Sequence, residues 1–251
     1  MTEEAAGEET FISHLVELRD RLVKASIGIA IACAALFIWP GPAQIYDLLA
    51  APMIASLPAG SKMIATGVIS PFLVPMKVTL LLAFILALPW VFYQLWAFVA
   101  PGLYAHEKRL VLPLVVSSSL LFVGGVAFCY FLVFGRVFQF IGEFAPASIA
   151  VTPDIENYLD FVMSMCLAFG VTFEVPVVVV ILVRMGIVSL EKLKAIRSYV
   201  IVGAFVIAAI VTPPDVVSQL ALAIPMCLLY ELGLIIAPIF ARVTRAPEEH
   251  A

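Results

Sequence analysis

The stretch FVMSMCLAFGVTFEVPVVVVILV at residues 161–183 decides the class of fold. Its second half, residues 175–183, is apolar on every face, and so is LLLAFILALP at residues 80–89. A strand of a membrane barrel would alternate polar and apolar side chains, whereas a membrane helix can be apolar all round. The pattern therefore predicts an all-α membrane protein.

The composition of the whole chain agrees with this prediction. Of its 251 residues, 63% are hydrophobic and 13% are charged, and the mean hydropathy is +1.12. A soluble domain carries about 25% charged residues. We expect one integral membrane domain over residues 1–251, with a six-span bundle within residues 22–240. Its apolar blocks lie at residues 22–39, 72–98, 110–134, 161–183, 199–211 and 216–230 or beyond.

The fifth block, YVIVGAFVIAAIV at residues 199–211, is too short for an ordinary span. At about 1.5 Å per residue it covers roughly 20 Å, against a hydrocarbon thickness of roughly 30 Å. We expect the last two spans to be short and to thin the membrane locally. Such thinning favours a function in moving material across the bilayer.

The basic residues predict the orientation of the six spans. All Lys and Arg residues except Lys62, Lys77 and Arg136 fall on one side of the membrane once the spans are accepted. By the positive-inside rule, both termini are cytoplasmic. Residues 1–21 then form a cytoplasmic amphipathic segment, because apolar side chains recur there at helical spacing. Residues 241–251 form a cytoplasmic tail.

Prolines are expected to shape the bundle. Those of residues 40–71, on the outer side, exclude one continuous helix and predict a cap of short helices and turns. Pro89, Pro176 and Pro225 fall inside apolar blocks, where each removes a backbone hydrogen bond and bends its helix. Bent helices could line a concave face, although membrane helices also tolerate proline without any such role.

Glu174 is an ionisable residue deep in an apolar block. An ionised carboxylate there is costly, so it should be protonated or face a polar partner. This favours a functional site, and the alternative is a structural role in which Pro176 and Thr172 or a water satisfy it. Thr212 and Gln219 are its natural polar companions if the last two spans pack on the fourth.

Glu17 and Glu107 both map to the predicted cytoplasmic surface. Two carboxylates on one face could clamp the guanidinium groups of a partner, because each accepts a bidentate pair of hydrogen bonds from arginine. A structural alternative exists for each residue taken alone. Glu17 could pair with Arg21 one turn later, and Glu107 with Lys108 or Arg109.

Motifs for catalysis are absent from the sequence. It contains no HExxH, no GxSxG and no glycine-rich phosphate loop. The four cysteines lie inside apolar blocks without CxxC pairing, so they predict neither a disulfide framework nor a metal site. We expect no enzyme activity, no metal and no cofactor.

Five strings, in order and spacing, resemble the TatC family, the multispanning receptors of the twin-arginine translocase. They are HLVELR at residues 14–19, WAFVAPGLY at 96–104, HEKR at 106–109, FGVTFEVP at 169–176 and TPPD at 212–215. The likeness extends along nearly the whole chain. Two departures are Asp20, where a basic residue is common, and Lys108, where arginine is common.

The resemblance implies a glove-shaped, multi-pass protein of the prokaryotic cytoplasmic membrane. It implies a receptor for signal peptides carrying paired arginines, which works with the single-span proteins TatA and TatB. Folded proteins are then exported with the proton-motive force. We expect contact with membrane lipid, a homo-oligomer within a larger complex, and no nucleic-acid partner.

The resemblance also implies roles for individual residues. Positions matching Glu17 and Glu107 bind the twin-arginine motif, and the position matching Arg19 is functionally sensitive. Positions matching Glu174, Thr212 and Gln219 resemble the intramembrane polar surface on which TatA or TatB pack. Two further sensitive positions match Pro52, in the outer cap, and Asp215.

Two other functions compete with the receptor. A cation- or proton-coupled transporter could use Glu174 as its titrating residue, but such proteins usually show an internal repeat, and no second copy of the FEVP environment occurs in the sequence. A passive scaffold that only organises other spans would not need Glu17 or Glu107.

Overall fold

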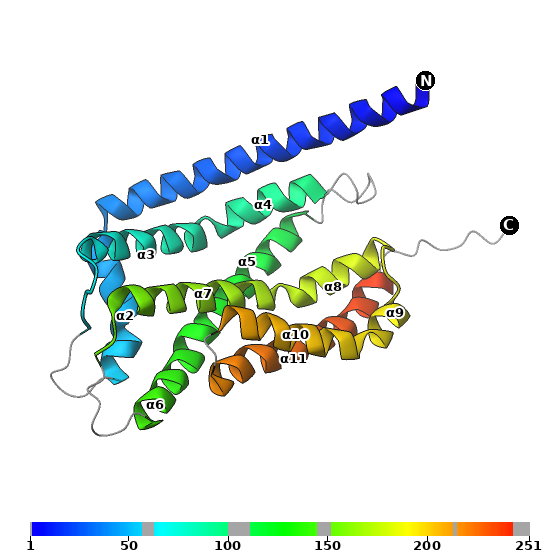
Figure 1. The fold of residues 1–251 in the computed structure, drawn as a ribbon. Helices are drawn as coiled ribbons and strands as arrows, with labels where there is room; N and C mark the ends of the chain where they lie inside the picture. Colours follow the sequence, from blue (N-terminus) through cyan, green and yellow to red (C-terminus); the bar gives the residue numbers. More distant parts are fainter. Residues whose placement is uncertain (1, 57–62, 100–110, 145–151, 213–214, 243–251) are drawn as a thin grey trace. The chain divides into compact units, whose positions relative to one another are not determined.

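The computed structural model describes residues 2–56, 63–99, 111–144, 152–212 and 215–242, and these residues are almost entirely helical (Figure 1). Their extended pairing is limited to one parallel bridge between Ile64 and Asp154. The prediction of an all-α protein is confirmed. Contacts divide the chain into two compact units, Met1–Pro42 with Thr79–Ser119, and Ala43–Val78 with Leu120–Ala251.

In the first unit, α1 (Thr2–Ile38) packs along α4 (Leu88–Val99) (Figure 1). The indole Nε1 of Trp90 on α4 donates to the Lys24 carbonyl on α1 at 2.8 Å. The prediction placed an amphipathic segment at residues 1–21 before the first span. The structure has no helix boundary at that point, because α1 continues unbroken through it.

The second apolar block is a bent pair of helices. Helix α3 (Ser70–Leu86) and helix α4 meet at Ala87 with a bend of 56°. Pro89 is the second residue of α4, where its missing N–H removes no hydrogen bond of that helix. The bend predicted from Pro89 is confirmed.

Helix α2 (Pro42–Ser56) begins the predicted outer cap, and turns follow it at residues 63–69. Two tyrosines of other helices hold its backbone. Tyr130 donates to the Leu48 carbonyl at 2.6 Å, and Tyr158 to the Leu49 carbonyl at 3.0 Å. The prediction of short helix and turns is confirmed for the described part of this segment, and Pro52 lies within α2.

The third and fourth blocks form α5 (Val111–Phe128), a π-helical turn η3 (Cys129–Val133), α6 (Phe134–Phe144), α7 (Ile155–Phe173) and α8 (Val175–Arg184). Helices α5 and α7 approach closely at Gly125, where a Cβ would lie 2.5 Å from the Phe169 carbonyl oxygen. Only glycine fits there, as at many close crossings of membrane helices. Glu174 forms the break between α7 and α8, two residues before Pro176.

The last block pairs α10 (Arg197–Val211) with α11 (Val216–Arg242), after a short α9 (Leu190–Ala195). Helix α11 packs most extensively on α8. Helix α10 is short, with 15 residues, as predicted. Helix α11 is not: its apolar part, Val216–Ile239, has 24 residues. The prediction of a short last span is wrong, because Pro225 does not interrupt the helix.

Among the described residues, four stretches are long and apolar enough to cross a membrane, and the bent pair α3–α4 makes up to five. The four are Ile12–Ile38, Val111–Phe140, Ile155–Arg184 and Val216–Ile239. The predicted count of six also needs α10, whose 15 residues cover about 22 Å. A crossing by α10 therefore stays a prediction.

Candidate functional site

The N-terminal half of α1 carries a polar cluster around Glu17. Arg21 follows it by one helical turn, so the two side chains lie on the same face. Arg21 Nη2 donates to Glu17 Oε1 at 3.2 Å, and Arg21 Nη1 donates to Gln94 Oε1 of α4 at 3.4 Å. The side chain of Glu17 is 35% exposed and that of Arg21 26%. Glu17 therefore holds a guanidinium group at the edge of solvent.

Two further contacts surround this cluster. Arg19 pairs with its neighbour Asp20 at 2.8 Å, and both side chains are exposed. His14 stacks on Phe98 of α4, with ring centroids 4.4 Å apart. Glu107 lies outside the described residues, so its predicted pairing with Glu17 across one face stays a prediction.

Glu174 lies half-buried at the junction of α7 and α8. Its N–H donates to the Val171 carbonyl at 3.0 Å, a tighter turn than an α-helical one, and its own carbonyl accepts from Val178 at 3.0 Å. Pro176 follows as the second residue of α8. The break thus places an ionisable side chain inside a predicted span, as the sequence indicated.

Thr212 follows the last residue of α10, Asp215 precedes the first residue of α11, and Gln219 lies near the start of α11. Asp215 Oδ1 accepts the N–H of Ser218 at 2.7 Å and so caps the start of α11. Thr212 is buried and donates its hydroxyl to the Ala208 carbonyl at 2.8 Å. Gln219 Nε2 donates to the Phe205 carbonyl of α10 at 3.3 Å. Each of these side chains therefore bonds to the backbone of α10 or α11.

The structure does not bring Gln219 to Glu174. Pro176, next to Glu174, contacts α11 at Gly233, where a Cβ would lie 3.1 Å from the Pro176 Cα. Gln219 lies fourteen residues earlier on α11, roughly 21 Å along the helix axis. Gln219 is therefore not a companion of Glu174 within one chain, and the same role for Thr212 stays a prediction. A partner helix running along the bundle could still contact both places.

A second polar cluster lies at the start of α7, around Asp154. Its Oδ1 accepts the N–H groups of Glu156 at 3.0 Å and Asn157 at 3.1 Å, as a helix N-cap does. Its Oδ2 accepts the hydroxyl of Thr66 at 2.7 Å and the N–H of Thr66 at 3.0 Å. These hydrogen bonds, the Thr66 hydroxyl foremost, lower the pKa of Asp154 to about 2.

The same region is tied by further contacts. Ile64 N–H donates to the Pro153 carbonyl at 3.0 Å, and Ile155 N–H to the Ile64 carbonyl at 2.8 Å. Ser70 donates its hydroxyl to Glu156 Oε2 at 2.6 Å. Residues 63–70 are therefore fastened to the beginning of α7.

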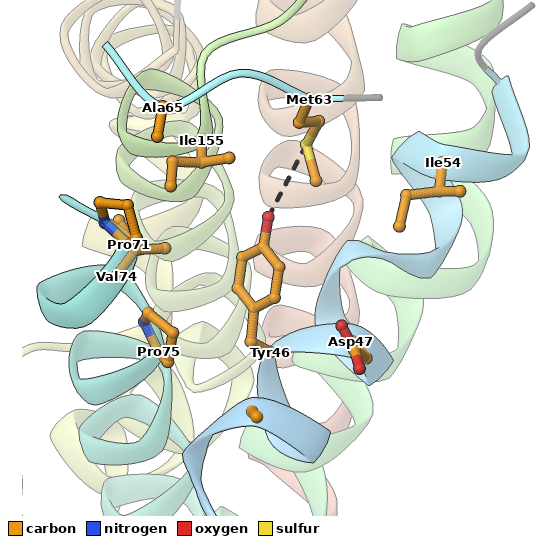
Figure 2. A pocket seen from close by; sticks show the side chains of 10 residues that line it. Tyr46, Asp47, Ile54, Met63, Ala65, Pro71, Val74, Pro75 and Ile155 are labelled. Atoms are coloured by element: carbon orange, nitrogen blue, oxygen red, sulfur yellow. Dashed lines mark hydrogen bonds between the residues drawn. The ribbon is translucent and has the colours of Figure 1, made fainter. Parts of the chain in front are cut away.

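A cavity of about 620 Å³ opens between α2, residues 63–65 and the start of α3. Figure 2 shows Tyr46 pointing into it, with its hydroxyl 4.0 Å from the sulfur of Met63. Most of its lining is apolar, and Asp47 is its charged residue. Burial, and to a lesser degree Asp47, raise the pKa of Tyr46. Of the predicted site residues whose side chains the structure describes, none lines this cavity.

Two members of these clusters were missed by sequence reasoning. Gln94 is an amide inside an otherwise apolar helix and is 3% exposed, so its isolation among apolar residues was an available signal. Asp154 precedes Ile155 and Glu156 in the pattern of an N-cap with an acidic first turn. Its contact with Thr66, 88 residues away, left no local signal.

Comparison with known proteins points to a single family. A family profile described as "Sec-independent protein translocase protein (TatC)" matches residues 13–225. The TatC protein of Halothiobacillus neapolitanus is 48% identical over 250 residues, which cover 99% of this chain and 68% of that protein. The TatC protein of Escherichia coli strain K12 is 49% identical over 241 residues, covering 96% and 93%.

A solved structure agrees with these sequences. It is described as "Crystal Structure of Twin Arginine Translocase Receptor- TatC" and is 37% identical to this chain. The two superpose with a TM-score of 0.79, covering 91% of this chain and 100% of the other.

Proposed function

This chain belongs to the TatC family of Sec-independent protein translocases, and on that premise we propose that it is the receptor for twin-arginine signal peptides. The family makes it a multi-pass inner-membrane component of protein transport rather than an enzyme. In the proposed function it assembles with TatA and TatB and exports folded proteins with the proton-motive force.

The observation that carries the proposal is the Glu17 carboxylate. It already accepts a hydrogen bond from one guanidinium, that of Arg21, through Oε1. Solvent reaches the Glu17 side chain, so an arginine of a peptide could approach it. The arginine would meet a carboxylate that already binds a guanidinium group. Glu107 supplies the second carboxylate of the proposed clamp. Arg19, two residues after Glu17 on α1, belongs to the same proposed site.

A clamp of this kind distinguishes arginine from lysine. A guanidinium presents two parallel N–H groups to one carboxylate, whereas an ammonium acts as a point charge. Hydrogen bonds to charged groups are worth about 1.5–3 kcal/mol, and about 1.4 kcal/mol corresponds to a tenfold change in affinity. Removing both carboxylates should therefore weaken binding tenfold or more.

The test uses the full chain in detergent and a fluorescently labelled peptide with an Arg-Arg motif. We expect Glu17→Gln and Glu107→Gln each to weaken binding, and the double variant to weaken it tenfold or more. The matched control is Asp20→Asn, which removes a carboxylate from the same turn of α1 and should have a smaller effect. Equal affinity for Arg-Arg and Lys-Lys peptides would overturn the clamp.

Glu174, Thr212 and Gln219 are proposed as the surface on which TatA or TatB helices pack. Support comes from their positions, since Glu174 is half-buried at a helix break and Gln219 is half-buried on α11. Gln219 lies roughly 21 Å along α11 from Gly233, the residue that contacts Pro176, and this spacing suits a partner helix that lies along α11. In this proposal six spans form one domain with cytoplasmic termini, and several copies join a larger complex.

Copurification with TatA and TatB tests this surface. We expect Glu174→Ala and Gln219→Ala to reduce the amount of partner recovered while peptide binding stays intact. The control is Asp160→Ala, which removes an exposed carboxylate from α7 near its other end. Full recovery of both partners by both variants would contradict the proposal, and loss of folding by Glu174→Ala would favour its structural role.

Pro52 and Asp215 are proposed as positions where a substitution impairs function by disturbing the local structure. Asp215 caps α11 by accepting a hydrogen bond from the Ser218 N–H. Its replacement should therefore destabilise the first turn of α11. Pro52 lies within α2 of the outer cap.

A further inference from the structure

Arg21 occupies the place where a peptide arginine is proposed to bind. Its guanidinium is divided between two acceptors, Glu17 at 3.2 Å and Gln94 at 3.4 Å, so it offers Glu17 only one N–H. We propose that Arg21 is a resident competitor for the Glu17 carboxylate, which an incoming peptide arginine must displace. The inference rests on the proposed function of Glu17 and adds a residue that sets the affinity of that site.

The geometry makes the exchange favourable. A contact of 3.2 Å is longer than the 2.7–2.9 Å typical of strong charge-assisted hydrogen bonds. Ion pairs one helical turn apart, with both side chains partly exposed, are weak. A peptide guanidinium arriving from solvent can engage both oxygens of Glu17. One long contact is thus replaced by two parallel ones.

Gln94 gives the displaced arginine an acceptor. The Gln94 side chain is 3% exposed, and its oxygen already receives Arg21 Nη1. When Arg21 leaves Glu17 it can keep this neutral partner, so the half-buried guanidinium does not lose its last hydrogen bond. Gln94 therefore lowers the cost of displacement without itself competing for the peptide.

Arg21 also contributes charge. Residues 12–24 contain three cations, Arg19, Arg21 and Lys24, and two anions, Glu17 and Asp20. The local net charge is therefore +1, which a doubly charged twin-arginine motif must approach at short range. Arg21 has to leave Glu17 before any ligand can bind there. It therefore lowers the affinity for Arg-Arg and for Lys-Lys peptides by the same factor.

The first test measures binding of labelled Arg-Arg and Lys-Lys peptides to the full chain by fluorescence anisotropy. Arg21→Gln should tighten both about twofold, the scale of a partly solvated ion pair at this spacing. Lys24→Gln is the matched control, because it removes the same charge one turn further along without vacating Glu17. Its effect should be smaller and should disappear at high salt.

Unchanged or weaker binding by a folded Arg21→Gln would overturn the proposal and make Arg21 a positioning residue for Glu17. The melting temperature of each variant shows whether it is folded. If Arg21→Gln does not fold, Arg21→Lys takes its place, since an ammonium lacks the planar fork by which a guanidinium presents separate N–H groups to two acceptors, and it should also tighten binding. If the wild type binds neither peptide, the proposed function itself fails, which is a distinguishable result.

The second test is a double-mutant cycle with Gln94→Leu. In the wild-type background this change should weaken peptide binding, because displaced Arg21 loses its remaining acceptor. In the Arg21→Gln background it should have no effect. An equal effect in both backgrounds would show that Gln94 and Arg21 are not coupled and would remove this part of the proposal.

Discussion

Glu17, near the middle of α1, and Asp154, at the start of α7, are both partly accessible carboxylates, yet their surroundings differ. Asp154 uses both oxygens in four hydrogen bonds of 2.7–3.1 Å, all from Thr66, Glu156 and Asn157. Within the described part of the chain, Glu17 receives one hydrogen bond, of 3.2 Å, from Arg21, a side chain that also has a second partner. The first carboxylate is committed to the fold, and the second can exchange its partner.

The difference lies in the donors. Three of the four donors to Asp154 are backbone N–H groups, whose positions are set once α7 and residues 63–66 are in place. The donor to Glu17 is a long side chain with several rotatable bonds. A site for a ligand needs a partner that can leave, and a structural tie needs one that cannot.

The largest expected effect is a difference in stability between variants that lack one or the other carboxylate. Asp154→Ala should lower the melting temperature clearly, because it removes the cap of α7 and its tie to Thr66 together. Glu17→Ala should change the free energy of unfolding by only about 0.3–0.5 kcal/mol, the value of a solvated pair one helical turn apart. Scanning fluorimetry of both variants in detergent measures their melting temperatures. Equal decreases in the two variants would contradict the difference between the two carboxylates.

A smaller effect concerns pH. The pKa of Asp154 is lowered to about 2 from its ordinary value of 3.8, so its stabilising contribution is complete above about pH 4 and is lost as the pH falls through 2. Wild type should therefore lose more stability than Asp154→Asn between pH 5 and pH 2. Melting temperatures of the two proteins across this range provide the measurement. Parallel curves would argue against stabilisation by the hydrogen bonds of the Asp154 carboxylate.

The smallest effect comes from Thr66→Val, which removes one of the four hydrogen bonds and keeps the shape of the side chain. The backbone N–H of residue 66 still donates to Asp154, so the melting temperature should fall less than in Asp154→Ala. The Thr66 hydroxyl is the main cause of the lowered pKa. Acid destabilisation should therefore begin at a higher pH in this variant, and an unchanged acid profile would contradict that assignment.

Local rules predicted much of the fold. Apolar runs on all faces predicted helices, and Pro89 predicted the bend that appears at Ala87. The same reasoning gave a short last span, which is wrong because α11 continues through Pro225. It also placed a boundary near residue 21 that α1 lacks. Hydrophobicity changes along a helix without ending it, since backbone hydrogen bonds do not depend on side-chain polarity.

Sequence spacing also predicted part of the candidate site. Arg21 was recognised as a partner for Glu17, because residues four apart share a helix face. Gln94 was not recognised, since it reaches Arg21 only through the packing of α4 on α1. Glu174 was expected deep in an apolar block close to Pro176, and the structure adds that it forms the break between α7 and α8. Gln219 was grouped with Glu174, although α11 separates the two positions along its length.

By itself the sequence determined that this protein is a helical membrane protein, that one helix bends near Pro89, and which carboxylates stand out. Composition and spacing along one chain segment are enough for such properties. Only the tertiary structure decided that Asp154 binds Thr66, that Gln94 shares Arg21 with Glu17, and that Glu174 and Gln219 lie apart. Each of these depends on distances between segments far apart in the chain, which the packing of helices sets.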